Sequence, residues 1–206
     1  MRIVKGEDGL FVSLQGEGML SGTPMTFLRL WGCNLKCPWC DQPEALKPRG
    51  YINVSVDEVF EGIVELGCLD LCITGGEPLI QAEEVAELSR KLSQTHGITV
   101  ETNASIFHPI PQVNFWSLSP KLHKWPDEEV LLWIDHCTQY QVPFQMKVVC
   151  NSVADVTSAI TLLGDYRTLL MVQPQWGTEN LEDIIAYCVE QNVRLSFQTH
   201  KWLGIR

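Results

Sequence analysis

The chain has 206 residues, of which 45% are hydrophobic and 19% are charged, and it carries a formal net charge of −10. This length and composition predict one soluble globular domain spanning residues 1–206. The acidic balance and the lack of a basic run argue against a nucleic-acid partner. No apolar run approaches the roughly 18 residues of a membrane span, which argues against a membrane partner.

The first residues of the chain lack the apolar block of a signal peptide, which indicates a cytoplasmic protein. The sequence nevertheless contains eight cysteines. A reducing compartment keeps thiols free, and clustered cysteines there usually bind metal or take part in catalysis. We therefore expect ligands or buried thiols rather than disulfides.

Short β-branched runs alternate with segments of helical periodicity along the chain. The runs predict strands over residues 25–30, 69–74, 98–102, 115–118, 144–149, 169–172 and 194–197. Apolar residues at i, i+3 and i+4 predict helices over residues 56–66, 82–94, 128–140, 153–163 and 181–191. Such units imply parallel strands with right-handed crossovers. Since about five helices are too few for eight βα units, we expect an α/β fold, a reduced and open barrel with fewer helices than strands.

Polar segments follow the ends of several predicted strands. Cys33 follows the first strand, Gly-Gly-Glu-Pro at 75–78 the second, Asn103 the third and Ser-Pro-Lys at 119–121 the fourth. Gln-Pro-Gln-Trp at 173–176 and Gln-Thr-His-Lys at 198–201 follow later strands. In α/β proteins these carboxyl ends meet at one rim and form the active site.

Cys33, Cys37 and Cys40 have C-x3-C-x2-C spacing. A [4Fe–4S] cluster normally takes four cysteines, so three would leave one iron open to a small molecule. The alternative is half of a zinc site, for which Cys68 and Cys72 form the only other close pair. Cys72 lies inside a predicted buried strand and is poorly placed as a ligand. The remaining cysteines fall in helix or strand patterns and are expected to be buried and inert.

This cysteine spacing, with Trp39 before the last cysteine, resembles the cluster loop of the radical S-adenosylmethionine (radical SAM) superfamily. Ile-Thr-Gly-Gly-Glu-Pro at 73–78 resembles the superfamily segment whose backbone binds the methionine amino group of SAM. The resemblance implies a radical SAM type of barrel, a [4Fe–4S] cluster on the three cysteines, and SAM as cofactor. One electron from the cluster cleaves SAM to a 5′-deoxyadenosyl radical, which abstracts hydrogen from the substrate, so no side chain is assigned as the catalytic group.

Within the superfamily the chain resembles the 7-carboxy-7-deazaguanine synthase family over nearly its whole length. The matching patterns are Leu-Gln-Gly-Glu-Gly at 14–18, Arg29, Ser-Pro-Lys at 119–121 and Gln-Thr-His-Lys at 198–201. The resemblance implies conversion of 6-carboxy-5,6,7,8-tetrahydropterin to 7-carboxy-7-deazaguanine with loss of ammonia, in queuosine and deazapurine biosynthesis. It also implies Mg²⁺, a flavodoxin-type reductant and a homodimer.

The resemblance also assigns site residues. Cofactor-binding positions would be Trp39, Asp41, Gly76, Ser119, Pro120, Lys121, Gln173, Pro174, Gln175 and Trp176. Substrate-binding positions would be Leu14, Gln15, Gly16, Arg29, Thr74 and Arg206. Taken alone, several of these residues could equally form ordinary turns, surface charges or packing contacts.

Two of these positions carry physical arguments of their own. Arg29 lies in an otherwise apolar strand, where an unpaired charge is costly and a substrate carboxylate, or an aspartate, would pair with it. Gln42 stands where the family usually has Thr or Ser, whose hydroxyl helps to bind Mg²⁺. An amide oxygen can also bind Mg²⁺ but projects further, so Gln42 is the clearest departure from the family pattern.

Two other functions remain open at this stage. One is a radical SAM activase that abstracts hydrogen from a glycine of a partner protein. The other is a non-enzymatic module that binds zinc or transfers electrons from a fully ligated cluster. The first would need no pterin pocket, and the second would have no affinity for SAM.

Overall fold

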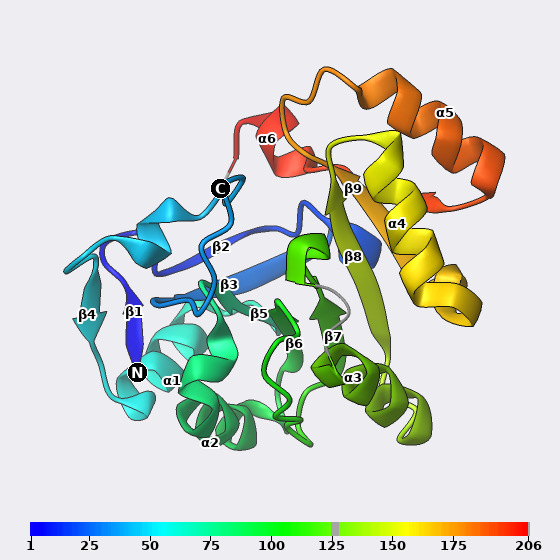
Figure 1. Cartoon of the computed structure of the whole chain (residues 1–206). Coiled ribbons are helices and arrows are strands. Elements are labelled where there is room, and N and C mark those ends of the chain that lie inside the picture. Colours follow the sequence, from blue (N-terminus) through cyan, green and yellow to red (C-terminus); the bar gives the residue numbers. More distant parts are fainter. Residues whose placement is uncertain (125–127, 206) are drawn as a thin grey trace.

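The computed structural model describes residues 1–124 and 128–205, which form one mixed sheet flanked by helices (Figure 1). The sheet is ten-stranded, in the order β10-β9-β8-β7-β6-β5-β3-β1-β4, with β2 paired to β3. Its strands are β1 (Arg2–Val4), β2 (Leu10–Leu14), β3 (Pro24–Leu30), β4 (Tyr51–Asn53), β5 (Asp70–Gly75), β6 (Gly97–Thr102), β7 (Phe115–Leu118), β8 (Phe144–Cys150), β9 (Leu170–Pro174) and β10 (Arg194–Leu195).

The strands from β3 through β10 along this order pair in parallel, whereas β1, β2 and β4 pair antiparallel. The strand order has two ends, β10 and β4, so the sheet of the described residues is open. This arrangement confirms the expected reduced, open α/β barrel.

Helices alternate with the parallel strands and cover the sheet. They are α1 (Val56–Leu66), α2 (Ala82–Leu92), α3 (Glu128–Gln139), α4 (Val153–Leu163) and α5 (Leu181–Gln191), followed by the short α6 (Thr199–Leu203). Helix α1 begins at Ser55 with a capping box, in which Ser55 and Glu58 satisfy each other's backbone N–H groups. Figure 1 shows α1 to α5 along one side of the curved sheet and α6 away from them.

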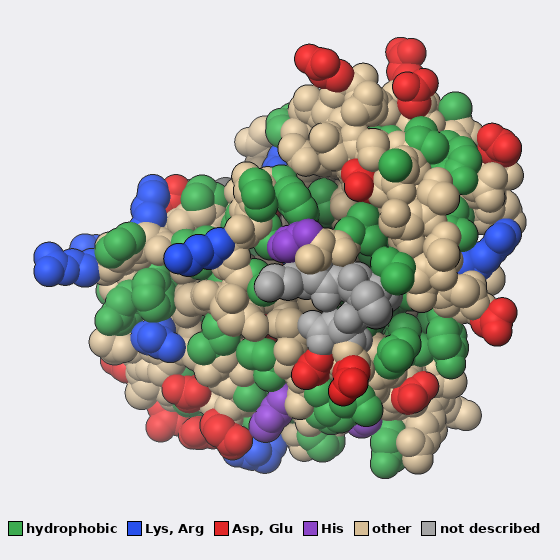
Figure 2. Space-filling view, in the orientation of Figure 1, with side chains coloured by type: hydrophobic (Ala, Val, Ile, Leu, Met, Phe, Trp, Pro, Cys, Tyr) green, Lys and Arg blue, Asp and Glu red, His purple; other side chains and the backbone are tan. Residues whose placement is uncertain are grey.

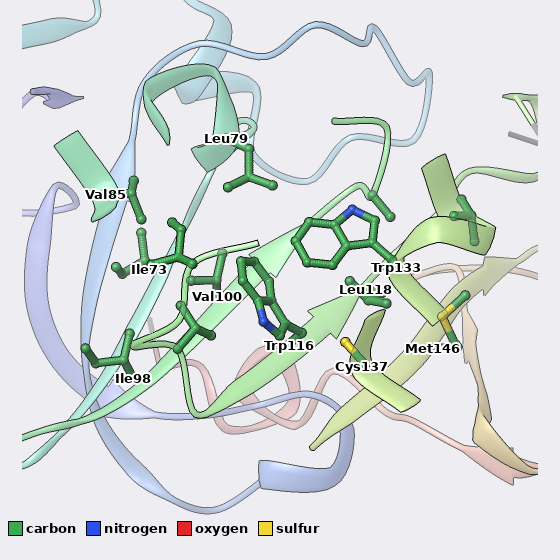
Figure 3. Packing of buried hydrophobic residues seen from close by; sticks show 14 of the residues in the cluster. Ile73, Leu79, Val85, Ile98, Val100, Trp116, Leu118, Trp133, Cys137 and Met146 are labelled. Carbon is green, nitrogen blue, oxygen red and sulfur yellow. The ribbon is translucent and has the colours of Figure 1, made fainter. Parts of the chain in front are cut away.

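The hydrophobic core lies between the sheet and these helices. Figure 3 shows Ile73, Val100 and Leu118 from successive strands beneath Leu79 and Trp133. Trp133 of α3 is fully buried, and its ring lies 4.4 Å from that of Trp116 between centroids. Its Nε1 donates to the Ile106 carbonyl at 3.2 Å, which satisfies the polar edge of the buried indole.

Successive side chains of each strand point to opposite faces of the sheet, and this alternation separates core from site. In β3, Leu28 and Leu30 enter the core, whereas Arg29 lines a cavity on the other face. In β8, Met146 and Val148 enter the core and Lys147 lines the same cavity. Polar residues inside apolar runs therefore mark the inner face of the barrel.

The predicted strands and helices are present, with small differences at their ends. The helices end at Leu92 and Gln139 rather than at 94 and 140, and the last strand ends at Leu195 rather than at 197. After β10, Ser196 N still donates to the Val172 carbonyl at 2.8 Å, and the Ser196 hydroxyl donates to Gln173 Oε1 at 3.1 Å. The sequence analysis did not predict β1, β2, β4 or α6, which are short and lack a clear period.

The surface carries more acidic than basic side chains, as the net charge of −10 implies. On the face of the described residues seen in Figure 2, acidic side chains gather where α2 and α5 lie, and Lys and Arg side chains form no continuous patch. Within the described residues, no helix has both the length and the apolar character needed to cross a membrane.

Candidate active site

A cavity of about 450 Å³ opens at the carboxyl ends of the parallel strands, and its size suits a small-molecule ligand. Most of the residues that the sequence analysis assigned to cofactor or substrate binding line this cavity. The predicted residues that line it are Leu14, Gln15, Gly16, Arg29, Cys33, Cys37, Trp39, Cys40, Asp41, Gln42, Thr74, Gly76, Ser119, Lys121, Gln173, Gln175 and Trp176. Pro120 and Pro174 are buried outside the lining, and Arg206 lies outside the described residues.

The three cysteines occupy the loop between β3 and β4. All three are free thiols; Cys33 and Cys37 are half-buried and Cys40 is exposed. A turn in which Cys40 N donates to the Cys37 carbonyl at 3.1 Å holds the last two together. Burial raises the pKa of Cys33 and Cys37, and the nearby Lys121 ammonium acts in the opposite direction on Cys37.

The donor set suits a cluster better than a single ion. Among the described residues, no group of three or more His, Cys, Asp or Glu side chains is placed to hold one metal ion. Cys72, the other cysteine considered for a zinc site together with Cys68, is fully buried in β5, as expected. Three thiols lining one cavity suit iron–sulfur ligation, because each thiolate then binds a different iron of the cluster.

The Gly-Gly-Glu-Pro segment packs directly on the backbone that leads into the cysteine loop. Gly76 N donates to the Leu30 carbonyl at 3.0 Å, and Glu77 N to the Gly32 carbonyl at 2.8 Å. A Cβ atom on Gly76 would lie 2.0 Å from the Gly32 oxygen, and Gly75 has a positive φ of 122°. Glycine is therefore required here for contact between two backbones.

Glu77 fixes this segment to the next strand. The side chain is fully buried, and its Oε1 accepts from Leu79 N at 3.0 Å and from Thr102 Oγ1 at 2.8 Å. Its Oε2 accepts from Asn103 N at 2.7 Å. Burial raises the pKa of Glu77, and these hydrogen bonds oppose that shift. The carboxyl group thus joins the ends of β5 and β6 at the rim of the cavity.

Arg29 enters the cavity beside Thr74, its register partner on β5. Its guanidinium carbon lies 5.1 Å from the centroid of the Phe11 ring, and its Nε is buried without a hydrogen-bond partner in the described part of the chain. Burial lowers the pKa of Arg29, whereas Asp8, Asp41 and Glu101 raise it. A buried donor without a partner suits an anionic ligand group.

A buried charge network crosses the floor of the cavity. Lys147 Nζ forms an ion pair with Glu17, and lies 3.7 Å from Glu101 Oε1. Glu101 also accepts from Gln15 Nε2 at 3.1 Å and from Thr74 Oγ1 at 2.9 Å. Gln15 and Thr74, which the resemblance assigns to substrate binding, are therefore held in place by the Glu101 carboxylate of β6.

Burial by itself would raise the pKa of Glu17. The Lys147 ammonium and hydrogen bonds from Lys147 and Gln198 outweigh that effect and lower the pKa to about 2. Burial works against the charge of Lys147, but Glu101 and Glu17 raise its pKa overall. Both groups are therefore ionised at neutral pH.

From the sequence, Glu101 and Lys147 were expected only to line the site, and Glu17 was part of the matching 14–18 segment; none of the three was given a chemical role. The sequence around Lys147 could have indicated that this residue has a charged partner, because a lysine flanked by apolar residues in a buried strand is costly without one. Nothing local identifies that partner as Glu17, which is 130 residues away in the sequence.

Lys121 lines the same cavity, and its Nζ donates to Ser119 Oγ at 2.9 Å. Burial lowers its pKa, and Cys37 and Asp41 raise it in turn. The ammonium shares the cavity with the cysteine loop and the charged network, a position suited to an anionic part of a bound ligand.

Comparison with known proteins identifies this arrangement. The sequence model described as "Radical SAM superfamily" matches residues 31–185. The 7-carboxy-7-deazaguanine synthase of Methanospirillum hungatei is 33% identical over 202 residues, which cover 95% of this chain and 84% of that protein. The synthase of Synechocystis is 33% identical over 201 residues, covering 95% and 91% of the two chains.

The chain belongs to the 7-carboxy-7-deazaguanine synthase family of the radical SAM superfamily. A crystal structure of QueE from Escherichia coli superposes with a TM-score of 0.70 and 23% identity, and covers 91% of both chains. At that identity the likeness concerns the fold, and it agrees with the open barrel described above.

In this family member the C-terminal segment closes one side of the cavity. Thr199 N donates to the Gly16 carbonyl at 2.9 Å, and Gln198 Nε2 bridges Glu17 Oε1 at 2.8 Å and Asp41 Oδ2 at 2.9 Å. Lys201 Nζ lies 3.2 Å from Asp41 Oδ2. Residues 198–201, at the start of α6, are thereby held against residues 16–17 after β2 and against Asp41 in the cysteine loop.

The contact at Gly76 leads to a first prediction. Replacing Gly76 with Ala forces the Gly32 backbone to move, and should lower the free energy of unfolding in urea by about 1–3 kcal/mol. The matched control is Gly62→Ala in α1, where the added Cβ atom would meet a flexible Leu10 methyl group at 2.9 Å instead of a backbone atom. Equal stability of the Gly76 variant and the control would contradict the backbone contact.

The ion pair at Glu17 leads to a second prediction. Glu17→Gln leaves Lys147 less compensated, and should lower the free energy of unfolding by about 3 kcal/mol at pH 7. Because the pKa of Glu17 is lowered from 4.5 to about 2 on folding, the contribution is complete above pH 4.5 and is lost as the pH falls toward 2. The variant and the wild type should therefore converge in acid.

Urea unfolding between pH 3 and pH 8 measures this difference. Glu65→Gln, at an exposed position of α1, serves as the control and should change the free energy of unfolding by less than about 0.5 kcal/mol at every pH. A Glu17→Gln difference that stays constant from pH 8 to pH 3 would rule out the lowered pKa as its origin.

Proposed function

We propose that this chain is a radical SAM lyase that converts 6-carboxy-5,6,7,8-tetrahydropterin to 7-carboxy-7-deazaguanine with loss of ammonia. The observation that carries the proposal is that one cavity of a chain of this family is lined by three free cysteines and by Arg29, whose buried Nε has no hydrogen-bond partner among the described residues. The reaction would serve queuosine or another deazapurine product.

Cys33, Cys37 and Cys40 would hold the [4Fe–4S] cluster. When reduced, the cluster together with SAM supplies a 5′-deoxyadenosyl radical that abstracts hydrogen from the substrate. Gly76 would offer backbone groups to the methionine end of SAM, and the paired Ser119 and Lys121 would bind its ribose or carboxylate. The remaining SAM contacts would come from Trp39, Asp41, Pro120, Gln173, Pro174, Gln175 and Trp176.

The substrate would lie on the other side of the cavity. Arg29 would bind the pterin carboxylate through its guanidinium, which supplies parallel donors in a fork geometry. Gln15 and Thr74, held by Glu101, would present polar groups to the ring, and Leu14 and Gly16 would supply backbone contacts. Arg206 is retained as a substrate contact from the sequence pattern.

Gln42 would bind Mg²⁺ through its side-chain oxygen, an oxygen donor of the kind that this ion prefers. Its backbone carbonyl accepts from Ala45 N at 3.1 Å, so the loop fixes the position of the residue beside Asp41. We also retain a homodimer and a flavodoxin-type reductant from the family resemblance, and a cytoplasmic location without a nucleic-acid or membrane partner from the composition of the sequence.

Anaerobic turnover of the reconstituted full chain tests the function. With SAM, Mg²⁺, dithionite and 6-carboxytetrahydropterin, mass spectrometry should detect 7-carboxy-7-deazaguanine while SAM is recovered. Omitting Mg²⁺ should lower the rate, and Cys37→Ala should abolish SAM cleavage, whereas Cys68→Ala should leave it intact. Cleavage of SAM to 5′-deoxyadenosine without the deazaguanine would refute the pterin substrate.

Arg29 permits a sharper test of substrate recognition. Arg29→Ala should raise KM for the carboxypterin by roughly 10- to 100-fold through the loss of a charge-assisted pair, and slow uncoupled SAM cleavage should persist. Arg29→Lys keeps the charge without the fork and should give a smaller increase. Loss of the iron–sulfur absorption in both variants would mean that Arg29 supports the fold instead.

A further inference from the structure

Asn103 stands directly after β6 and reaches the first cysteine of the loop. Its Nδ2 lies 3.9 Å from Cys33 Sγ and donates to Asn34 Oδ1 at 3.0 Å. The same sulfur accepts a backbone hydrogen bond from Leu35 N at 3.4 Å. Two N–H donors thus converge on one of the three thiols, and one of them comes from a side chain of another strand.

The orientation of the Asn103 amide is fixed by its oxygen. Oδ1 accepts from Ser105 N at 2.9 Å and from Ser105 Oγ at 2.6 Å. A flipped amide would turn its NH₂ group toward the backbone N–H of Ser105, placing two donors face to face. The nitrogen therefore points toward Asn34 and Cys33.

The backbone of Asn103 is held equally firmly. Its N–H donates to the buried Glu77 carboxyl at 2.7 Å, and the next residue, Ala104, has a left-handed φ of 62°. Ala104 N donates to Thr102 Oγ1 at 3.1 Å, which in turn donates to Glu77. A non-glycine residue keeps such a conformation only where its surroundings fix it, so the turn presents Asn103 rigidly.

We infer that Asn103 is a positioning residue that donates an N–H···S hydrogen bond to the Cys33 thiolate and raises the reduction potential of the cluster. The inference rests on the proposed function. Hydrogen bonds to the sulfurs are among the features that set iron–sulfur potentials. Reduction adds one negative charge to the cluster, and an N–H dipole aimed at its sulfur stabilises that charge.

Redox titration of the reconstituted full chain, followed by electron paramagnetic resonance and without pterin, tests the inference. Asn103→Leu removes the donor and should make one-electron reduction about tenfold less favourable, which lowers the midpoint by about 59 mV. Asn103→Asp keeps the acceptor for Ser105 but places a negative charge near the sulfur, and should lower the midpoint further. Asn53→Leu, on exposed β4, should leave it unchanged.

The outcomes separate this inference from the proposed function. A midpoint equal to that of the wild type in both Asn103 variants, at equal iron and sulfide content, would overturn the role of Asn103 alone. If the Asn103→Leu chain does not fold, the Asn103→Asp midpoint decides the question by the same criterion. A wild-type chain that binds no cluster would overturn both proposals.

Discussion

The contact between two backbones at the ends of β3 and β5 is the constraint on which the site depends. The parallel pairing of these strands continues beyond them, where Gly76 and Glu77 donate to the carbonyls of Leu30 and Gly32. This approach leaves no space for a Cβ atom on Gly76. It sets the start of the cysteine loop relative to the sheet, and so places the thiols in the cavity.

The second determinant of the site is the cost of burying charge. Glu77, Lys147 and Glu17 all lie inside the barrel or at its rim, where a charge without a partner would be strongly destabilising. Each is joined to groups from other parts of the chain, so hydrogen bonds and ion pairs connect these parts on the inner face of the barrel in addition to the hydrophobic core. Half-buried Arg29 is the exception, because its buried Nε has no hydrogen-bond partner among the described residues.

Much of the site was predictable because its residues form short local patterns. The spacing of Cys33, Cys37 and Cys40 and the paired glycines at 75 and 76 are visible without a structure, and both line the cavity or its rim. The helices over 56–66, 153–163 and 181–191 follow from their apolar period and have the predicted bounds. The short strands β1 and β4 were missed, since three residues are too few to show a period.

The sequence by itself determined the parallel strands, the five longer helices and the cysteine spacing of the loop, because these depend on neighbours along the chain. Only the tertiary structure decided which buried charges meet. Lys147 pairs with Glu17 across 130 residues, and Asn103 reaches Cys33 across 70. Such contacts depend on the order of strands in the sheet, which local periodicity does not specify.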